Sequence, residues 1–335
     1  MNGAPDKRVG LHDVASRAEV ALSTASNALN GRGRVAATTR DRVRAVADEL
    51  GYLPHPVARG LRVGRSRMIG VAVRMYLDEP DRYPADIYYG LLITACSTTA
   101  SRRGYALALL PQQALDVVAD LPLAAIIVTD TETNDPALEH AHTLGIPVIT
   151  DYRPDDSRSA VVVDADVPAA VSMVNDHLVE AGARRVGLLS IEPGDNAFAA
   201  QWEKSHAGWC DKHGFDLTVD RGPAIDVDRL EAAATRLWNA GCDAVVGIPI
   251  GSGLALLDAA AALGKRVPAD VLVAAVDENP DLAISDPPLT TVGLDPVATA
   301  VQGTNLVIDV IEGKVQPPVE LFVPGHLNVR ASTQR

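Results

Sequence analysis

The sequence has few cysteines and few large aromatic side chains. It contains three Cys, three Phe and three Trp among 335 residues. The cysteines, Cys96, Cys210 and Cys242, are widely spaced and odd in number, which excludes a zinc-type spacing or a disulfide framework and fits a reduced cytosolic protein. Because aromatic residues are scarce, the cores must be built mainly from Ala, Val, Leu and Ile.

Long apolar runs are also missing. No stretch of about 18 uncharged apolar residues occurs, so we expect no membrane-spanning helix. The opening residues, Met-Asn-Gly-Ala-Pro-Asp-Lys-Arg, lead into no apolar segment of the kind that a signal peptide needs. These two absences predict a cytoplasmic protein.

Catalytic and phosphate-binding motifs are absent as well. The body has no G-x-S-x-G, no G-x-x-x-x-G-K and no G-x-G-x-x-G at the start of a helix. His140 and His142 lie two positions apart on an expected helix, which directs them to different faces and argues against a metal pair. We therefore expect no enzyme activity, no metal and no cofactor.

Negative charge is scarce only at the start of the chain. Residues 1–67 carry 12 Lys/Arg and 6 Asp/Glu, a net charge of +6, whereas the remainder carries 18 and 37, a net charge of −19. A small basic segment on an acidic body indicates that only this segment meets a polyanion. The alternative is a basic surface that serves solubility alone.

Within the basic segment, residues 11–29 carry two helical patterns. Leu11, Val14, Ala15 and Ala18 follow helical spacing, and a second phase begins after Glu19-Val20-Ala21. Two short helices joined by a three-residue turn indicate a helix-turn-helix. The polar face of the second helix, about 22–29, bears Leu22, Ser23, Ser26 and Asn27, which are short enough to approach base edges in a major groove. A two-helix piece of some other helical core remains the alternative.

Two basic segments follow these helices. The glycine-rich run 30–34 can bring backbone amides and arginines close to phosphates. A third helix is expected at 38–50 and completes a headpiece over residues 1–53. Residues 54–67 are a linker in which 57–63 can become a short helix on DNA, with Leu61 as an apolar wedge; a disordered basic linker is the alternative.

From residue 68 onward, apolar strands alternate with helices, which predicts an α/β body with parallel, doubly wound sheets. We expect a first lobe over about 68–165 plus 295–335 and a second over about 166–294. Expected strands are 69–73, 105–110, 124–129, 147–150, 186–189, 244–248 and 271–276. Expected helices are 90–103, 115–120, 137–145, 168–182, 202–214, 228–241, 252–264 and 297–312.

Ligands in open α/β sheets bind beyond the carboxyl ends of the strands, so a cleft between the lobes is the expected site for a small polar ligand. The candidates there combine carboxylates, amides and aromatic rings. They are Tyr83, Asp151, Tyr152, Gln201, Trp202, Ser205 and Asp277. Trp202 could equally belong to the core, and each Asp could equally cap a helix.

Taken in order, these motifs resemble the lactose-repressor (LacI/GalR) family of bacterial transcription regulators over nearly the whole chain. The matching stretches begin at Asp13-Val-Ala, Ser23-Thr-Ala-Ser-Asn-Ala-Leu-Asn-Gly31 and Arg42-Val, and continue through Glu49-Leu-Gly-Tyr52 and Ala58-Arg-Gly-Leu-Arg-Val-Gly-Arg-Ser66. The body adds Ile69-Gly-Val71, Ile146-Pro-Val148, His177-Leu-Val-Glu-Ala-Gly182, Val271-Leu-Val-Ala-Ala-Val-Asp277, Pro288-Leu-Thr-Thr-Val292 and Val329-Arg-Ala-Ser-Thr333.

The resemblance implies a homodimer on a near-palindromic operator in double-stranded DNA, close to the nucleoid. It also implies a periplasmic-binding-protein-like domain that binds a small effector, such as a sugar or another polar metabolite, and so sets operator affinity. The DNA-binding residues implied are Leu22, Ser23, Thr24, Ser26, Asn27, Asn30, Arg34, Ala58 and Leu61. Asn pairs best with adenine, whereas many relatives carry Arg at the position of Asn27.

Several departures from the family pattern matter. Relatives usually have Gly at Glu19 and Ser at Ala21 and Ala36, so weaker capping should destabilise this headpiece. Relatives often hold Arg where Ser205 stands and Asn-Asp at 249–250, so the effector is unusual, less polar or absent. A solute-binding protein for transport is the alternative function, which the basic segment disfavours; an α/β enzyme is a third, for which no catalytic set is found.

Overall fold

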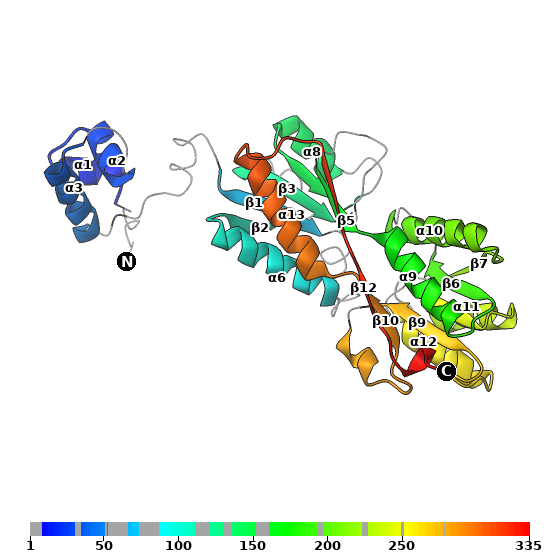
Figure 1. The fold of residues 1–335 in the computed structure, drawn as a ribbon. Coiled ribbons are helices and arrows are strands. Elements are labelled where there is room, and N and C mark those ends of the chain that lie inside the picture. The colour runs from blue at the N-terminus through cyan, green and yellow to red at the C-terminus, as the bar shows by residue number, and fades with distance from the viewer. Residues whose placement is uncertain are drawn as a thin grey trace, which may run out of the picture. The chain divides into compact units, whose positions relative to one another are not determined.

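The chain divides into two compact units, residues 1–66 and 67–335, which are treated separately below. The computed structural model describes residues 9–30, 35–50, 52, 66–73, 87–110, 121–129, 131, 136–151, 161–192, 197–222, 227–248, 251–277 and 279–335 (Figure 1). The expected helix at 115–120 and the linker helix at 57–63 lie outside these residues. None of the described helices is long and apolar enough to cross a membrane.

The first unit is a bundle of α1 (Leu11–Arg17), α2 (Leu22–Asn30) and α3 (Ala37–Glu49). Among the described residues of this unit, the fully buried side chains are small, and larger ones such as Leu11, Leu29 and Tyr52 pack against them while partly exposed. The buried residues are Val14, Ala15, Ala18, Ala25, Ala28, Val43 and Ala47. Such short side chains let three short helices pack closely, so the bundle forms with little apolar area in each helix.

Two terminal features of these helices are unfavourable. Glu19, in the turn between α1 and α2, has a φ of 51°, a left-handed conformation that favours glycine. Ala36 precedes α3 and offers no side-chain cap. Both positions are departures from the family pattern, and both have a direct structural cost.

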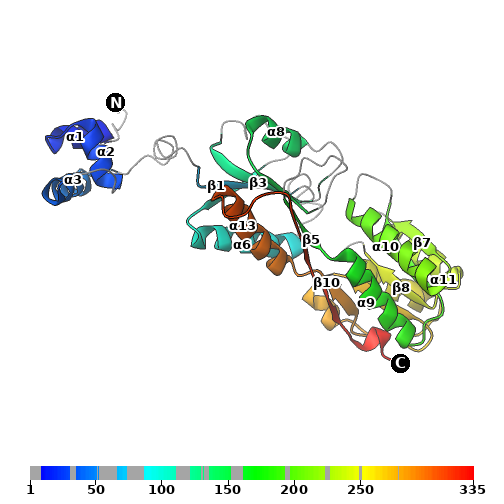
Figure 2. The same ribbon diagram turned by 45° about the horizontal axis from the view of Figure 1, so that its top comes forward.

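The second unit has two lobes, each built on a six-stranded sheet. In lobe 1 the strand order is β11-β5-β4-β3-β1-β2, and all pairs are parallel. The strands are β1 (Met68–Val73), β2 (Ala106–Leu110), β3 (Leu123–Thr129), β4 (Val148–Thr150), β5 (Val161–Ala165) and β11 (Val319–Val323). Helices α6 (Ile87–Arg102) and α13 (Pro296–Ile311) pack together on one face, and α8 (Pro136–Leu144) lies on the other (Figures 1 and 2).

Lobe 2 repeats this plan with the order β12-β10-β9-β8-β6-β7. Its strands are β6 (Val186–Ile191), β7 (Thr218–Gly222), β8 (Ala244–Gly247), β9 (Leu272–Val276), β10 (Thr290–Gly293) and β12 (His326–Asn328). Helices α9 (Val167–Glu180) and α10 (Ala197–His213) cover one face, and α11 (Val227–Asn239) and α12 (Ser252–Ala262) cover the other. The sheet is not purely parallel as expected, because β12 runs antiparallel to β10.

The chain passes between the lobes at three places: after β5, after β10 and after β11. The first and third passages are joined, since Asp166 N donates to Val323 O at 2.9 Å. A Cβ on Gly325 would lie 2.9 Å from Gly293 O, so the second and third passages are in close backbone contact. The tail differs from expectation: residues 326–333 return to lobe 2 instead of remaining in lobe 1.

Two helix starts also differ from the expected ones. Helix α6 begins at Ile87 rather than at residue 90, and α10 begins at Ala197 rather than at residue 202. The earlier start of α10 makes Gln201 a helical residue as well, together with Trp202 and Ser205, which the expected helix over 202–214 already included. A helix has a 3.6-residue period, so Gln201 and Ser205, four residues apart, lie on one face of α10, whereas Trp202 points about 100° away from Gln201.

Candidate functional site

The first candidate site is the outer face of α2. Ala25 and Ala28 point inward and are fully buried, which turns Leu22, Ser23 and Asn27 to solvent. Thr24 and Ser26 are half-buried at the edges of this face. An exposed face of short polar side chains is compatible with close contact to the base edges of a major groove.

The remaining DNA-binding candidates fall on parts of the chain that the structure does not describe. The side chain of Asn30 and the whole of Arg34, Ala58 and Leu61 lie outside the described residues. Their assignment to phosphate and minor-groove contacts stays a prediction from sequence.

The second candidate site is an interlobe cavity of about 270 Å³ in the body. It lies at the carboxyl ends of the central strands of both sheets, as the parallel sheets predict. Lobe 1 contributes the ends of β3, β4 and β5 together with residues of α6 and α13. Lobe 2 contributes the ends of β6, β8, β9 and β10 and residues of α10 and α12.

Two carboxylates of lobe 1 line this cavity. Asp151 follows β4, and its Oδ1 accepts hydrogen bonds from the amide and the hydroxyl of Thr131 at 3.2 and 3.1 Å. Asp164 lies near the end of β5, the strand that pairs with β4. Burial, followed by the charge of Asp151, raises the pKa of Asp164 to about 7.

One hydrogen bond crosses the cavity from lobe to lobe. Gln201 Nε2, on α10 of lobe 2, donates to Asp164 Oδ2 of lobe 1 at 3.0 Å. On the lobe 2 side, Asp277 follows β9 and accepts from the backbone amide of Asn279 at 2.8 Å. The two lobes therefore meet at polar groups that a bound molecule could contact together.

The sequence candidates divide into three groups. Asp151, Gln201 and Asp277 line the cavity. Trp202 and Ser205 are not among its described lining residues: Trp202 is 1% exposed in the core of lobe 2, one helical position past Gln201. Tyr83 and Tyr152 lie outside the described residues.

Asp164 lines the cavity and was not among the candidates. The apolar run Val161-Val162-Val163 before it is a strand signal that would have marked Asp164 as a strand-end carboxylate. Tyr88, Leu92 and Phe198 were also missed as lining residues, because each belongs to a helix whose orientation toward the cleft depends on packing.

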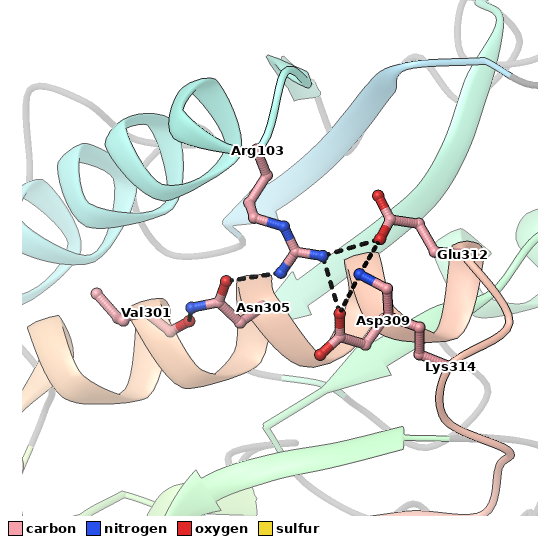
Figure 3. A network of polar contacts seen from close by, with 6 residues as sticks. All are labelled: Arg103, Val301, Asn305, Asp309, Glu312 and Lys314. Atoms are coloured by element: carbon pink, nitrogen blue, oxygen red, sulfur yellow. Dashed lines mark hydrogen bonds and ion pairs between the residues drawn. The ribbon is translucent and has the colours of Figure 1, made fainter.

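Helices α6 and α13, which form one wall of the cavity, are held together by Arg103 (Figure 3). Arg103 follows α6, and its guanidinium donates to Asn305 Oδ1 at 3.0 Å, Asp309 Oδ1 at 2.8 Å and Glu312 Oε2 at 3.0 Å, all on or next to α13. Branched donation to several acceptors suits the planar guanidinium. This network fixes the far ends of the two helices whose other turns face the cavity.

Within the described residues, no group of three or more His, Cys, Asp or Glu could hold a metal ion. The lining residues offer carboxylates, amides, hydroxyls and apolar side chains, which are suited to binding and orienting a small molecule.

Comparison with known proteins identifies both units. The family model described as "Bacterial regulatory proteins, lacI family" matches residues 10–55, and "Periplasmic binding protein-like domain" matches residues 175–333. The regulator MalR of Streptomyces coelicolor is 30% identical over 351 residues, covering 96% of each chain. The regulator CelR of Thermobifida fusca is 25% identical, covering 97% of this chain and 98% of that protein.

Solved structures share the fold. The Lac repressor dimer bound to operator and the anti-inducer ONPF superposes with a TM-score of 0.80 at 22% identity, over 98% of this chain and 100% of that one. The CelR–cellobiose complex gives a TM-score of 0.70 at 24% identity, over 97% and 100%. These regulators favour the first function over the transport alternative, and the chain belongs to the lacI family of bacterial DNA-binding transcriptional regulators.

Proposed function

We propose that this regulator is a homodimeric repressor whose grip on a near-palindromic operator is set by a small carbohydrate-like molecule in the interlobe cavity. The observation that carries the proposal is the combination, in one chain, of an exposed face of short side chains on α2 and an interlobe cavity spanned by the hydrogen bond between Gln201 and Asp164. The relatives supply the ligand class, since one structure is a CelR–cellobiose complex.

Coupling between the sites follows from lobe closure. A ligand that contacts both lobes binds best when they are closed, so it shifts the population toward the closed arrangement. The proposal assigns the linker 54–67 the role of a helix that orders on DNA, with Leu61 entering the minor groove. By linkage, operator DNA changes ligand affinity by the same factor as the ligand changes operator affinity.

The residues proposed to contact bases are Leu22, Ser23 and Asn27, with Thr24 and Ser26 at the margin. Asn30 and Arg34 are proposed phosphate contacts, and Ala58 lies in the proposed hinge helix with Leu61. For the cavity, the proposal retains Asp151, Gln201 and Asp277 and adds Asp164. We also infer that the protein acts without catalysis and in the cytoplasm, where its DNA target lies.

The test is operator selection from random DNA followed by anisotropy measurements at fixed salt. Replacing Asn27 by Ala should weaken operator binding about 5- to 100-fold, the usual cost of one bidentate base contact. Leu61→Ala should weaken specific binding more than non-specific binding. Asn239→Ala changes an exposed asparagine of lobe 2 and should change neither. Equal affinity of all four proteins for the selected site would refute the proposal.

A further inference from the structure

Helices α6 and α13 run from the interlobe cavity to the other end of lobe 1. Tyr88 and Leu92, in the first turns of α6, line the cavity, as do Thr299 and Ala300 in the first turns of α13. Each helix has 16 residues and is therefore about 24 Å long. Because β2 and β11 begin shortly after these helices, the last turns of α6 and α13 lie near the amino ends of the parallel strands, away from the cavity.

The chain enters the second unit at this same end of lobe 1, at Arg67, immediately before β1. The turn that follows α6 holds this residue: Arg67 O accepts from Ala106 N at 2.8 Å, and Arg67 Nη1 donates to Gly104 O at 3.5 Å. The guanidinium of Arg67 also lies over the ring of Tyr105, with Cζ 5.8 Å from the ring centroid, a cation–π arrangement. Main-chain and side-chain contacts therefore attach the end of the linker to residues 104–106.

Arg103 stands directly before this turn and binds α13 and its end at three acceptors (Figure 3). Its Nη2 donates to Asp309 and Glu312, and its Nη1 donates to Asn305. Asn305 Nδ2 donates to Val301 O at 2.9 Å, which turns the amide oxygen of Asn305 toward the guanidinium. Packed helices can slide past each other along apolar side chains, whereas directional hydrogen bonds at a second point fix their relative position.

The two carboxylates that bind Arg103 also have a second cation. Lys314 Nζ lies 2.5 Å from Glu312 Oε2 and 3.6 Å from Asp309 Oδ1. Removing the guanidinium therefore leaves neither carboxylate without a positive partner, and all these groups are partly exposed, so the fold loses little when the link between the helices is lost. The role of Arg103 can thus be separated from the stability of lobe 1.

We propose that Arg103 is a positioning residue that joins α6, α13 and the turn at 104–106 into one rigid element, so that the linker end at Arg67 follows each shift of the cavity wall. This inference rests on the proposed function, because it concerns how a molecule in the cavity acts on the DNA-binding unit. Without Arg103, the two helices move separately and the linker end is less well fixed. Binding to the operator then costs more conformational entropy, whereas binding to random DNA depends on phosphate contacts and does not.

The first measurement is amide hydrogen exchange of the full chain without DNA. Arg103→Gln should speed the exchange of amides 104–106 about fivefold, because the turn loses its attachment to α13. Arg103→Lys keeps a charge that reaches one acceptor and should restore part of the protection. The matched control is Arg236→Gln, which removes a paired arginine of lobe 2, bound to Asp220 by two hydrogen bonds of 2.7 Å, and should leave amides 104–106 unchanged. Unchanged exchange at 104–106 in Arg103→Gln would overturn the proposal.

The second measurement is anisotropy with the selected operator and with random DNA at several salt concentrations. Arg103→Gln and Arg67→Ala should each weaken operator binding about fivefold, and the double variant should bind no more weakly than either single one, because both changes break the same route. For Arg103→Gln, random-DNA binding and the slope of log affinity against log salt should stay as in the wild type, which shows that no phosphate contact is lost. Arg236→Gln should bind the operator normally. Additive effects of the two changes would refute the route through the turn.

Failure of this inference is distinct from failure of the proposed function. If Asn27→Ala weakens operator binding while the Arg103 and Arg67 variants bind as tightly as the wild type, the role of Arg103 is wrong and the proposed function stands. If the wild-type chain selects no palindrome from random DNA, the proposed function fails and this inference fails with it.

Discussion

Asp164 in lobe 1 and His206 in lobe 2 are buried or half-buried titratable side chains whose pKa values depart strongly from the ordinary ones, in opposite directions. Asp164 in lobe 1 has a pKa raised to about 7, with burial as the main cause. His206 in lobe 2 has a pKa lowered to about 4, also because of burial. Desolvation opposes charge in both cases, which raises the pKa of an acid and lowers that of a base.

Their surroundings differ more than their burial does. His206 is 1% exposed between α9 and α10, and Asn175 Nδ2 lies 3.1 Å from its Nδ1, which fits donation to an unprotonated ring nitrogen. Cys210 and Trp209 complete the surroundings of the neutral imidazole. Asp164 instead faces the interlobe cavity and two other acidic residues. His206 is thus kept neutral inside the core, whereas Asp164 combines a raised pKa with a place on the wall of the interlobe cavity, a combination typical of binding groups.

The largest expected change in the free energy of unfolding comes from replacing Asp164. The folded state binds a proton that the unfolded chain, with an ordinary aspartate pKa near 3.8, has already lost, so Asp164 destabilises the fold as the pH rises from about 4 to 7. Asp164→Asn should therefore raise the free energy of unfolding by up to about 4 kcal/mol at pH 8, and by little near pH 4. Urea unfolding at the two pH values measures this, and a loss of stability at pH 8 would contradict it.

His206 affects the pH dependence of stability in the opposite direction from Asp164: it lowers stability as the pH falls. The unfolded chain takes up a proton below the ordinary histidine pKa of 6.5, whereas the folded chain does so only near pH 4. Stability from this residue is thus complete above pH 6.5 and is lost as the pH falls toward 4, by about 3 kcal/mol. His206→Gln should flatten the pH dependence of unfolding over this window. His177, whose pKa burial also lowers, remains in both proteins and contributes equally.

A third prediction compares a buried hydroxyl that bonds to two backbone groups with a hydroxyl near the surface that makes one local bond. Ser332 is fully buried, accepts from Thr290 N at 2.8 Å and donates to Val273 O at 2.6 Å, so it fastens the tail to lobe 2. Ser332→Ala should lower the free energy of unfolding by about 2 kcal/mol, because two buried backbone groups lose their partner. Ser172→Ala removes a local bond near the surface and should change it by less than about 0.5 kcal/mol. Equal effects would show that the tail is not fastened in this way.

The sequence was sufficient for features that depend on local periodicity. The inward placement of Ala25 and Ala28 follows from spacing alone, as does the exposure of Ser23 and Asn27 on α2. The position of the interlobe cavity at strand ends followed from the parallel α/β pattern, and Asp151 and Asp277 were correctly expected to lie at strand ends.

Features set by long-range pairing could not be predicted in this way. The short edge strands β11 and β12 depend on partners more than 30 residues away, so the return of the tail to lobe 2 was missed. Trp202 was offered both as a strand-end candidate and as a core residue, and it lies in the core, because α10 starts at Ala197 and turns the indole inward. His177 and Thr333, quoted as separate motifs, meet at 2.7 Å between Nε2 and Oγ1. Their pairing is structural, and no spacing in the sequence indicates it.

The smallest expected change in stability concerns the headpiece, which is destabilised by a backbone conformation and not by a buried charge. Glu19 adopts a left-handed φ of 51°, which glycine adopts without a Cβ penalty. Glu19→Gly should stabilise the headpiece by about 1 kcal/mol, the left-handed penalty less the greater freedom of unfolded glycine. Amide hydrogen exchange of α1 and α2 in the full chain measures it. Glu19→Ala removes the same charge but keeps a Cβ, so it should leave exchange nearly unchanged; equal protection in the two variants would mean that charge, and not backbone conformation, limits the turn.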